Sequence, residues 1–391
     1  MVGVGGASEL RGDRGAGPLD RPGPRGAAGV SGVSPPDAGS ERPSGSALEQ
    51  GHDRVPRAIA LTPILAVRYR ARDLARIEAA APGARIVQVS AEGLADGPLD
   101  EVEVLLRGSL SAEVFDRLLA RAPRLVWVHS ATAGVERVLT PASRERRLVI
   151  TNARGVFSRP IAEYVVAVIL AVSRRLIEFL ELQRERTWQP LLGTELRDRT
   201  VGIVGYGSIG RAVASLLTPF GCRILAVRRR SELGAAAPEP EADRELPVAP
   251  RAERIVGPEQ LDEVLAAADF VVLAVPLTRA TANLIDAARI ERLKRGAWLI
   301  NVARGQLVDE VALRRALLDG RLGGAALDTF VDEPLPPSSP WWTTPNAIVT
   351  PHASWSSERV LDRSIELFCE NLGRYATGRP LRNVVDPDAG Y

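Results

Sequence analysis

The sequence predicts an α/β protein with two doubly wound parallel sheets, and three observations support this. From about residue 56, short runs of aliphatic residues alternate with segments of helical period, a pattern typical of parallel sheets covered by helices. The alternation restarts at Thr200, after a long apolar helical segment, which indicates a second unit. With 391 residues, the chain is long enough for two domains with separate cores.

The first unit is predicted to contain five strands and two helices before the long helix. The strands are expected at 59–65, 85–90, 102–108, 125–130 and 148–152. Helical periodicity marks 71–80 and 111–122, and the latter opens with Ser111, a residue type that favours the N-cap position. The long helix is predicted from about Pro160 to Trp188, with its proline in the first turn.

The second unit repeats the strand–helix alternation. Its strands are expected within 201–207, 223–229, 269–276, 297–305, 324–330 and 347–352. A last helix near 356–377 lies beyond this set, so the chain is expected to return to the first unit there. The division is therefore 56–155 plus 356–391 for one domain and 156–355 for the other, with 232–257 as a surface loop of the second.

The first 55 residues have a different composition from the rest of the chain. They are rich in Gly, Pro, Ser, Ala and Arg and contain no aromatic residue. Such a segment buries too little apolar surface to offset its ordering entropy, so 1–55 is expected to be a disordered N-terminal tail. The alternative is that this segment binds nucleic acid. However, its acidic residues are about as many as its basic residues, and it has no aromatic residue to stack on a nucleobase.

Composition excludes several function classes. The formal net charge is only +2, which argues against nucleic acid or membrane as a partner. Two distant cysteines, Cys222 and Cys369, and three histidines in all make a disulfide framework or a metal site improbable. The apolar run at 165–172 is too short to span a bilayer, and no secretory signal is seen at the N-terminus. A soluble, cytoplasmic protein without bound metal is expected.

A glycine-rich turn, GYGSIG at 205–210, follows an apolar strand and precedes a helical run. This context predicts a dinucleotide site. Gly205 permits the tight turn, Gly207 lets the backbone approach a pyrophosphate, and Gly210 lets the helix pack closely on the strand. The helix N-terminus then offers N–H groups to the phosphates. The alternative is a structural turn that holds no ligand.

The next strand ends in arginines where dinucleotide folds usually carry an acid. That acid binds the ribose 2′-hydroxyl of NAD and repels a 2′-phosphate. Arg228 and Arg229 reverse both effects, because guanidinium groups offer planar donors and positive charge to a phosphate. NADP is therefore the preferred cofactor, with NAD possible. The alternative is a solvated basic turn in an arginine-rich chain.

Three further strand ends carry polar residues that suit the reduction of a 2-ketoacid. A guanidinium can bind a carboxylate and the neighbouring ketone together, a role for Arg304. A histidine can deliver the proton that the ketone oxygen needs, a role for His352. A carboxylate beside that ring would favour its protonated form, a role for Glu333. Each residue could instead be a solvated or structural one, but their joint position behind a nucleotide turn favours the active site.

These segments closely resemble the D-isomer-specific 2-hydroxyacid dehydrogenases. The matching motifs are GIVGYGSIGRAVA, ADFVVLAVPLT, LINVARGQLVDE, ALDTFVDEPLP, NAIVTPHAS, LVWVHSATAGVERV and SRPIAEYVVAVIL, so the resemblance runs from about 58 to 386. It implies a flavodoxin-like substrate domain over 56–155 plus 356–391, and a Rossmann-like nucleotide-binding domain over 156–355. It also implies a homodimer joined partly through the helix at 160–175.

The resemblance assigns further residues. Arg304, Glu333 and His352 form the implied catalytic set, and Asp328 is implied to meet the nicotinamide carboxamide. Ser208, Ile209 and Pro276 match positions that line the cofactor. The backbone N–H groups of Ala133 and Gly134 are implied to hold the substrate carboxylate, with Arg304 as the side-chain ligand.

Arg228 departs from the family's NAD-selecting acid and resembles instead the NADP-linked branch, which includes glyoxylate and hydroxypyruvate reductases. The expected function is hydride transfer between NADP(H) and a small 2-ketoacid or D-2-hydroxyacid, in the reductive direction. Two alternatives stay open. One is a nucleotide-sensing protein like the family's transcriptional corepressors, and the other is phosphite or formate oxidation.

Overall fold

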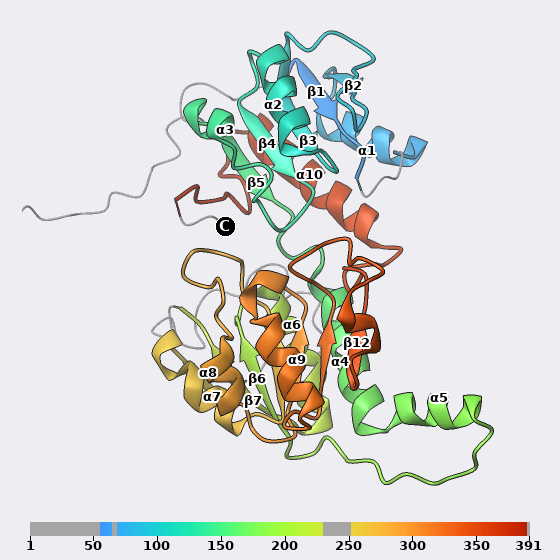
Figure 1. Ribbon diagram of the computed structural model, residues 1–391. Coiled ribbons are helices and arrows are strands. Elements are labelled where there is room, and N and C mark those ends of the chain that lie inside the picture. Colours follow the sequence, from blue (N-terminus) through green and yellow to red (C-terminus); the bar gives the residue numbers. More distant parts are fainter. Residues whose placement is uncertain (1–54, 65–68, 230–251, 389–391) are drawn as a thin grey trace, which may run out of the picture. The chain divides into compact units, whose positions relative to one another are not determined.

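Two parallel β-sheets with helices on both faces organise the chain (Figure 1). The computed structural model describes residues 55–64, 69–229 and 252–388. All strand pairs within the two sheets are parallel. The α/β class predicted from the alternation of strands and helices is therefore confirmed.

The first sheet has the order β2-β1-β3-β4-β5. Its strands are β1 (Ala58–Leu61), β2 (Arg85–Gln88), β3 (Val102–Arg107), β4 (Trp127–Ser130) and β5 (Val149–Asn152). Four of them fall within the segments predicted as strands, and β1 begins one residue before its predicted segment, 59–65. The order 2-1-3-4-5 is that of flavodoxin-like folds.

The helices of the first sheet are α1 (Ala71–Ala80), α2 (Ala112–Arg121) and the short α3 (Pro141–Glu145). The Ser111 side chain accepts a hydrogen bond from the Val114 amide, as an N-cap residue does. The last helix, α10 (Val360–Ala376), packs against α1 and buries Phe368 in the core formed with Trp127. The last helix of the chain therefore packs on the first sheet's core.

The second sheet has the order β12-β11-β10-β9-β6-β7-β8. Its strands are β6 (Thr200–Val204), β7 (Arg223–Val227), β8 (Arg254–Val256), β9 (Phe270–Leu273), β10 (Trp298–Asn301), β11 (Gly324–Leu327) and β12 (Ala347–Val349). The strand order reverses between β6 and β9. Ligands of open α/β sheets bind at such a switch point, outside the carboxyl ends of the strands.

Alternating side chains of the second sheet build two cores, one on each face. Phe270 and Val272 of β9 belong to the cluster with α4 (Ser158–Ser173) and α6 (Ser208–Leu217). Val271 and Leu273 point to the other face, because successive residues of a strand alternate. That face is covered by α7 (Leu261–Ala267), α8 (Ala287–Arg292) and α9 (Glu310–Leu318). Four short 3₁₀ helices, at 218–220, 258–260, 305–307 and 340–343, complete the elements described here.

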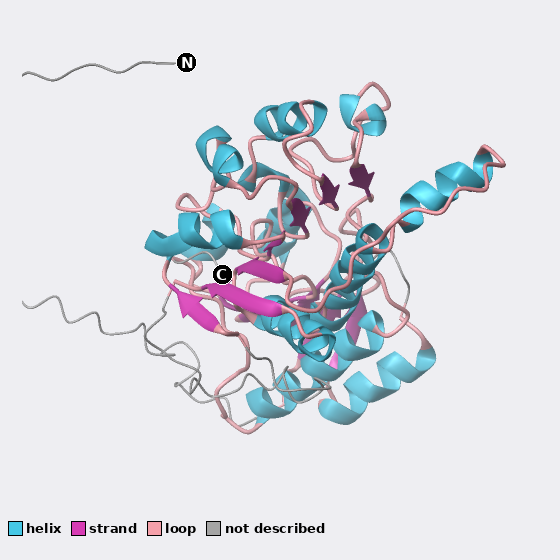
Figure 2. Ribbon diagram, turned by 90° about the horizontal axis from the view of Figure 1, so that it is seen from below, coloured by secondary structure: helices cyan, strands magenta, loops and turns pink. Residues whose placement is uncertain are grey.

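The long helix predicted from 160 to 188 is wrong as a single element. It is two helices, α4 and α5 (Leu176–Arg184), separated at Arg175, whose φ is +59°. The helix α4 buries one face against α6, whereas α5 has no buried residue. Beyond residue 173, core packing therefore does not keep the chain in line with the axis of α4. Arg175 forms a local ion pair with Glu178 at 2.8 Å. Figures 1 and 2 show α5 and the following segment extending away from α4.

Two other predictions concern loops. Most of the loop predicted over 232–257 lies outside the described residues, but its end forms β8, an edge strand paired with β7. The surface-loop prediction is wrong for these three residues, because Val256 is buried in the second core. The tail predicted over 1–55 also lies outside the described residues, apart from Val55.

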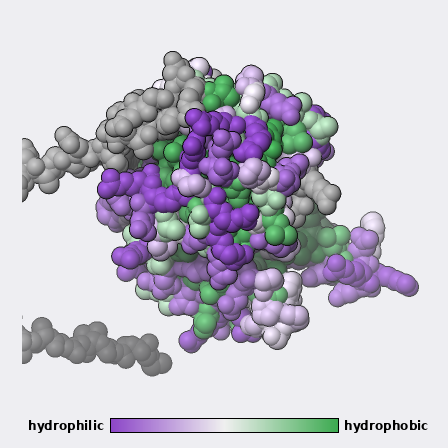
Figure 3. Space-filling model, turned by 90° about the horizontal axis from the view of Figure 1, so that it is seen from above, coloured by the Kyte–Doolittle hydropathy of each residue, from purple (hydrophilic) through white to green (hydrophobic). Residues whose placement is uncertain are grey.

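In the part of the chain that the structure describes, no helix is long and apolar enough to cross a membrane. Figure 3 shows hydrophilic and hydrophobic residues interspersed over the face that it presents.

Candidate active site

The glycine turn lies at the switch point of the second sheet. Gly205 has φ +106°, and a Cβ added there would lie 2.4 Å from the Ala274 carbonyl oxygen. A Cβ on Gly210 would lie 2.2 Å from the Gly205 carbonyl oxygen, so α6 approaches the turn as closely as only glycine allows. Gly207 is different, because no described residue other than its two chain neighbours has an atom within 4 Å of its Cβ position. The turn is thus packed at its ends and open in its middle.

The end of β7 lies directly beside this turn. The amides of Gly205 and Tyr206 both donate to the Val227 carbonyl, at 3.0 and 3.2 Å. Arg228 follows immediately, and its own amide donates to the Val256 carbonyl at 2.8 Å. Arg228 is half-buried and Arg229 is exposed. The strand end that carries the two arginines therefore adjoins the first two residues of the glycine turn.

Ser208 and Ile209, in the first turn of α6, are half-buried next to Gly207. Pro276 follows β9, and its carbonyl accepts a hydrogen bond from the Thr281 hydroxyl at 2.7 Å. The predicted cofactor-lining residues thus come from the two strand ends that flank the switch point, β6 and β9.

Arg304 follows β10 and reaches the loop that follows β4. Its Nε donates to Glu136 Oε1 at 3.2 Å, and its Nη1 donates to the Ala303 carbonyl at 2.7 Å. A Cβ on Gly134 would lie 2.2 Å from Nη2 of Arg304. The structure thus brings Arg304 and the predicted substrate loop together, and it places an acid, Glu136, at the guanidinium.

Ala133 and Gly134 are held in this loop by their carbonyl groups. The Ala133 carbonyl accepts from the Asn152 side chain at 2.9 Å, and the Gly134 carbonyl accepts from the Thr132 hydroxyl at 2.8 Å. Within residues 55–64, 69–229 and 252–388, no hydrogen bond is made by the amides of Ala133 and Gly134. Two N–H groups beside Arg304 are therefore available to an anion.

Glu333 and His352 form the central pair of the site. Nδ1 of His352 lies 2.9 Å from Glu333 Oε2, and the other oxygen of Glu333 accepts from the Phe330 amide at 3.0 Å. Glu333 is thereby fixed by backbone, and it orients the imidazole in turn. Both side chains keep more than a third of their surface exposed, 37% for Glu333 and 39% for His352. The paired ring can therefore reach a ligand with its Nε2 atom.

Asp328 is fully buried at the end of β11. Its Oδ1 accepts from the Thr350 hydroxyl at 2.6 Å and from the Ala353 amide at 2.8 Å, and its Oδ2 accepts from the Ser354 amide at 3.0 Å. These bonds hold the segment that carries His352. A contact between Asp328 and a nicotinamide carboxamide stays a prediction.

Sequence reasoning missed several residues that support the site. Glu136 was not singled out, although an acid inside the predicted substrate loop is a visible signal. Thr350 and Tyr164 were missed too, since their hydroxyl groups, 2.9 Å apart, belong to a strand end and to an apolar helix. Burial raises the pKa of the Tyr164 phenol, so it stays a neutral partner. In the described ranges, no cluster of three or more metal-ligating side chains is found.

Comparisons with known proteins identify the family. Residues 166–354 match the model of the D-isomer specific 2-hydroxyacid dehydrogenase NAD-binding domain. A glyoxylate reductase of Thermofilum pendens is 35% identical over 281 residues, which cover 70% of this chain and 77% of that protein. A glyoxylate reductase of Korarchaeum cryptofilum is 34% identical over 298 residues, 74% of this chain and 83% of that protein.

Solved structures give the same result. A D-isomer specific 2-hydroxyacid dehydrogenase from Xanthobacter autotrophicus, in complex with NADPH and MES, has a TM-score of 0.72 and 30% identity. The match covers 86% of this chain and all of that one. An NADPH-dependent glyoxylate/hydroxypyruvate reductase from Sinorhizobium meliloti, with NADP and sulfate, has a TM-score of 0.69 and 27% identity and covers 85% of this chain and all of that one. The chain belongs to the D-isomer specific 2-hydroxyacid dehydrogenase family.

Proposed function

We propose that this chain is an NADPH-linked reductase of small 2-ketoacids such as glyoxylate and hydroxypyruvate. Family membership makes it an NAD(P)-dependent dehydrogenase, and the proposal concerns its cofactor preference, direction and residues. The observation that carries it is the Glu333–His352 pair at 2.9 Å, at strand ends of the same sheet as Arg304. Relatives named glyoxylate reductase support the substrate class.

The residues at the switch point fit a dinucleotide. The open space at Gly207 leaves room for a pyrophosphate beside the N-terminus of α6, where free backbone N–H groups favour an anion. Gly205, Gly207, Ser208, Ile209 and Gly210 would hold that part, with Pro276 and Asp328 near the nicotinamide end. When bound, the nicotinamide supplies the hydride.

The chain's own residues bind the ketoacid and manage its proton. Arg304 binds the substrate carboxylate and ketone with parallel hydrogen bonds, which requires its guanidinium to exchange Glu136 for substrate. The amides of Ala133 and Gly134 add two donors to the carboxylate. His352, protonated and held at Nδ1 by Glu333, gives its Nε2 proton to the ketone oxygen as the carbon is reduced.

Selection of NADPH is assigned to Arg228 and Arg229. The strand end that carries them adjoins the glycine turn, where an acid would repel a 2′-phosphate and a guanidinium attracts it. Two solved relatives hold NADPH or NADP, which supports this preference. NADPH in turn favours the reductive direction.

The test is kcat/KM for NADPH and NADH, measured side by side with glyoxylate, hydroxypyruvate, pyruvate and phenylpyruvate. We expect a preference for NADPH of at least tenfold, about 1.4 kcal/mol of differential stabilisation. The double variant R228A/R229A should lose most of it. R223A is the matched control, because Arg223 is also an arginine of β7 but lies at the opposite end of the strand, where it pairs with Glu253. A preference for NADH in the wild type would contradict the proposed cofactor.

Two other outcomes would point to the alternatives. Binding of NADPH without oxidation by any ketoacid in a broad panel would favour a nucleotide-sensing protein. Oxidation of phosphite or formate would place the chain with another chemistry of the same family.

We propose a homodimer, with α4 and α5 at the interface. Large apolar side chains are exposed along α5 and after it: Leu176 at 51%, Leu180 at 53%, Trp188 at 101% and Leu192 at 94%. Apolar surface gathered on one extended segment is typical of an association surface. Light scattering should give the mass of a dimer, and L180S/W188S should lower it. V311S is the control, since Val311 on α9 is 83% exposed. A monomeric wild type would contradict the dimer.

We further propose 56–155 plus 356–391 and 156–355 as the substrate and nucleotide-binding domains, and a cytoplasmic location. The division is supported by α10, which packs on the first sheet's core. The location is supported by Cys222 and Cys369, which are unpaired. Cell fractionation tests the location, and recovery in the membrane pellet would contradict it.

A further inference from the structure

His352 has an unusual backbone for a residue with a side chain. Its φ is +51°, in the left-handed region, where a non-glycine residue is disfavoured by its Cβ. Its amide donates to the Thr350 carbonyl at 3.0 Å, which closes a tight turn of three residues, 350–352. Such a conformation persists only where neighbouring groups hold it.

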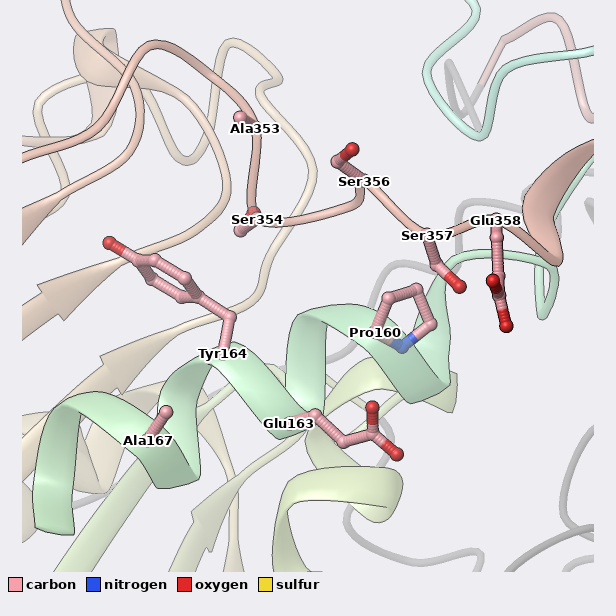
Figure 4. Close-up of a pocket in the computed structure, with 9 residues that line it drawn as sticks. All are labelled: Pro160, Glu163, Tyr164, Ala167, Ala353, Ser354, Ser356, Ser357 and Glu358. Carbon is pink, nitrogen blue, oxygen red and sulfur yellow. The ribbon is translucent and has the colours of Figure 1, made fainter.

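Asp328 holds the residues on either side of His352. It accepts from the Thr350 hydroxyl before it and from the amides of Ala353 and Ser354 after it. Tyr164 of α4 adds its hydroxyl to Thr350, and Figure 4 shows it extending from α4 toward the segment of Ala353 and Ser354. None of these bonds reaches His352 itself.

Trp355 supplies the side-chain contact to the His352 backbone. Its indole Nε1 donates to the His352 carbonyl at 2.6 Å. The ring is half-buried and meets Phe157 edge to face, with centroids 6.4 Å apart and planes at 81°. Phe157 is buried at the start of α4. The indole is thus fixed at its ring by the core and at its N–H by His352, and tryptophan has only this one polar atom to offer.

We propose that Trp355 is a positioning residue for His352. Its indole N–H fixes the His352 carbonyl, and thereby the left-handed backbone that keeps Nδ1 within hydrogen-bond reach of Glu333. The inference rests on the proposed role of His352 as the proton donor. The contact joins two residues of the chain, so its loss should change the proton step and leave cofactor binding intact.

The first test is W355F, which keeps an aromatic ring against Phe157 and removes the N–H. We expect kcat with NADPH and glyoxylate to fall about tenfold while the Kd of NADPH, measured by fluorescence, changes less than twofold. The matched control is W342F, because Trp342 also donates its indole N–H to a backbone carbonyl, that of Pro336 at 2.9 Å. The control should keep wild-type kcat.

A second replacement separates the hydrogen bond from packing. Benzothienylalanine at 355 keeps the bicyclic shape and replaces the N–H by sulfur, so it should reproduce the loss of kcat without lowering the thermal midpoint. If both replacements keep kcat within twofold of wild type, the inference is overturned. The inference is also overturned if, in both replacements, the loss of kcat is fully accounted for by the fraction of protein that is unfolded.

A readout independent of turnover distinguishes this inference from the proposed function. The chain has only three histidines, so the ring signals of His352 can be assigned by NMR. In W355F these signals should shift at fixed pH, and in W342F they should not. If the wild type reduced no ketoacid, the proposed function would fail, while unchanged His352 signals in W355F would refute the positioning role by itself.

Discussion

Glu333 and His352 reach their pairing from two segments, 19 residues apart, that follow β11 and β12. The backbone fixes both: the Phe330 amide holds Glu333, and the turn after Thr350 holds His352. We therefore expect the imidazole to be preorganised before a substrate arrives, which lowers the entropic part of the barrier.

Replacing His352 by Gln should lower kcat by about 10²- to 10⁴-fold, the range for removal of a general acid. The Kd of NADPH should stay nearly unchanged, because His352 is assigned to the ketoacid. E333Q should give a smaller loss, since its amide oxygen can still accept from the Phe330 amide while its charge is gone. Steady-state kinetics and NADPH titration measure both, and wild-type turnover in H352Q would refute the assigned role.

At the scale of residues, the sequence predicts which side chains lie at strand ends better than it predicts the hydrogen bonds that support them. Parallel strands bring their carboxyl ends to one edge, so Arg304, Glu333 and His352 could be placed there from motif positions alone. Which contacts support them depends on backbone turns that leave no periodic signal. The three hydrogen bonds that Asp328 accepts from residues 350–354 and the bond from Trp355 to His352 belong to this second kind.

At the scale of elements, the β6–turn–α6 unit predicts different effects for two glycines of one motif. In G207A the new methyl meets no atom within 4 Å beyond its two chain neighbours, so the thermal midpoint should stay within about 1 °C of wild type while the Kd of NADPH rises. In G210A the methyl would lie 2.2 Å from the Gly205 carbonyl oxygen, so about 1–3 kcal/mol of stability should be lost. Thermal unfolding and NADPH titration of the two variants check this pair, and equal loss of stability in both would contradict it.

The elements that sequence reasoning misplaced had local causes. Apolar spacing continues from α4 into α5, so periodicity alone predicts one helix, and a single left-handed residue, Arg175, breaks it. The short strand β8 follows a segment without periodic pattern, and its pairing with β7 at the sheet edge is a tertiary contact. By contrast, every longer buried strand was predicted. An aliphatic run between turn signals can be recognised in the sequence without knowing how the strand packs.

At the scale of the whole molecule, the alternation of strands and helices predicts parallel sheets, whereas the order of the strands within each sheet is set by tertiary contacts. The cores on the two faces of each sheet leave few ionisable groups inside. His129 of β4 is one of them, fully buried among Trp127, Phe368 and Thr151. Its Nδ1 lies 2.8 Å from the Thr151 hydroxyl, and its Nε2 has no hydrogen-bond partner among the residues described.

His129 makes global stability depend on pH. Burial lowers the pKa of its imidazole from 6.5 to about 3, so between these values the unfolded chain binds a proton that the folded chain does not. The contribution of neutral His129 to the free energy of unfolding is therefore fully present above pH 6.5. It declines as the pH falls, by about 1.4 kcal/mol per pH unit once the histidine of the unfolded chain is protonated. In urea unfolding at pH 7.5 and 5.5, His129→Asn should reduce the difference in unfolding free energy by about 1.4 kcal/mol relative to wild type. At pH 7.5 the variant should be less stable than wild type, because it loses the packing of the imidazole ring. The test is therefore the change in unfolding free energy with pH, and not its absolute value. An unchanged slope would show that His129 accepts a proton in the folded state.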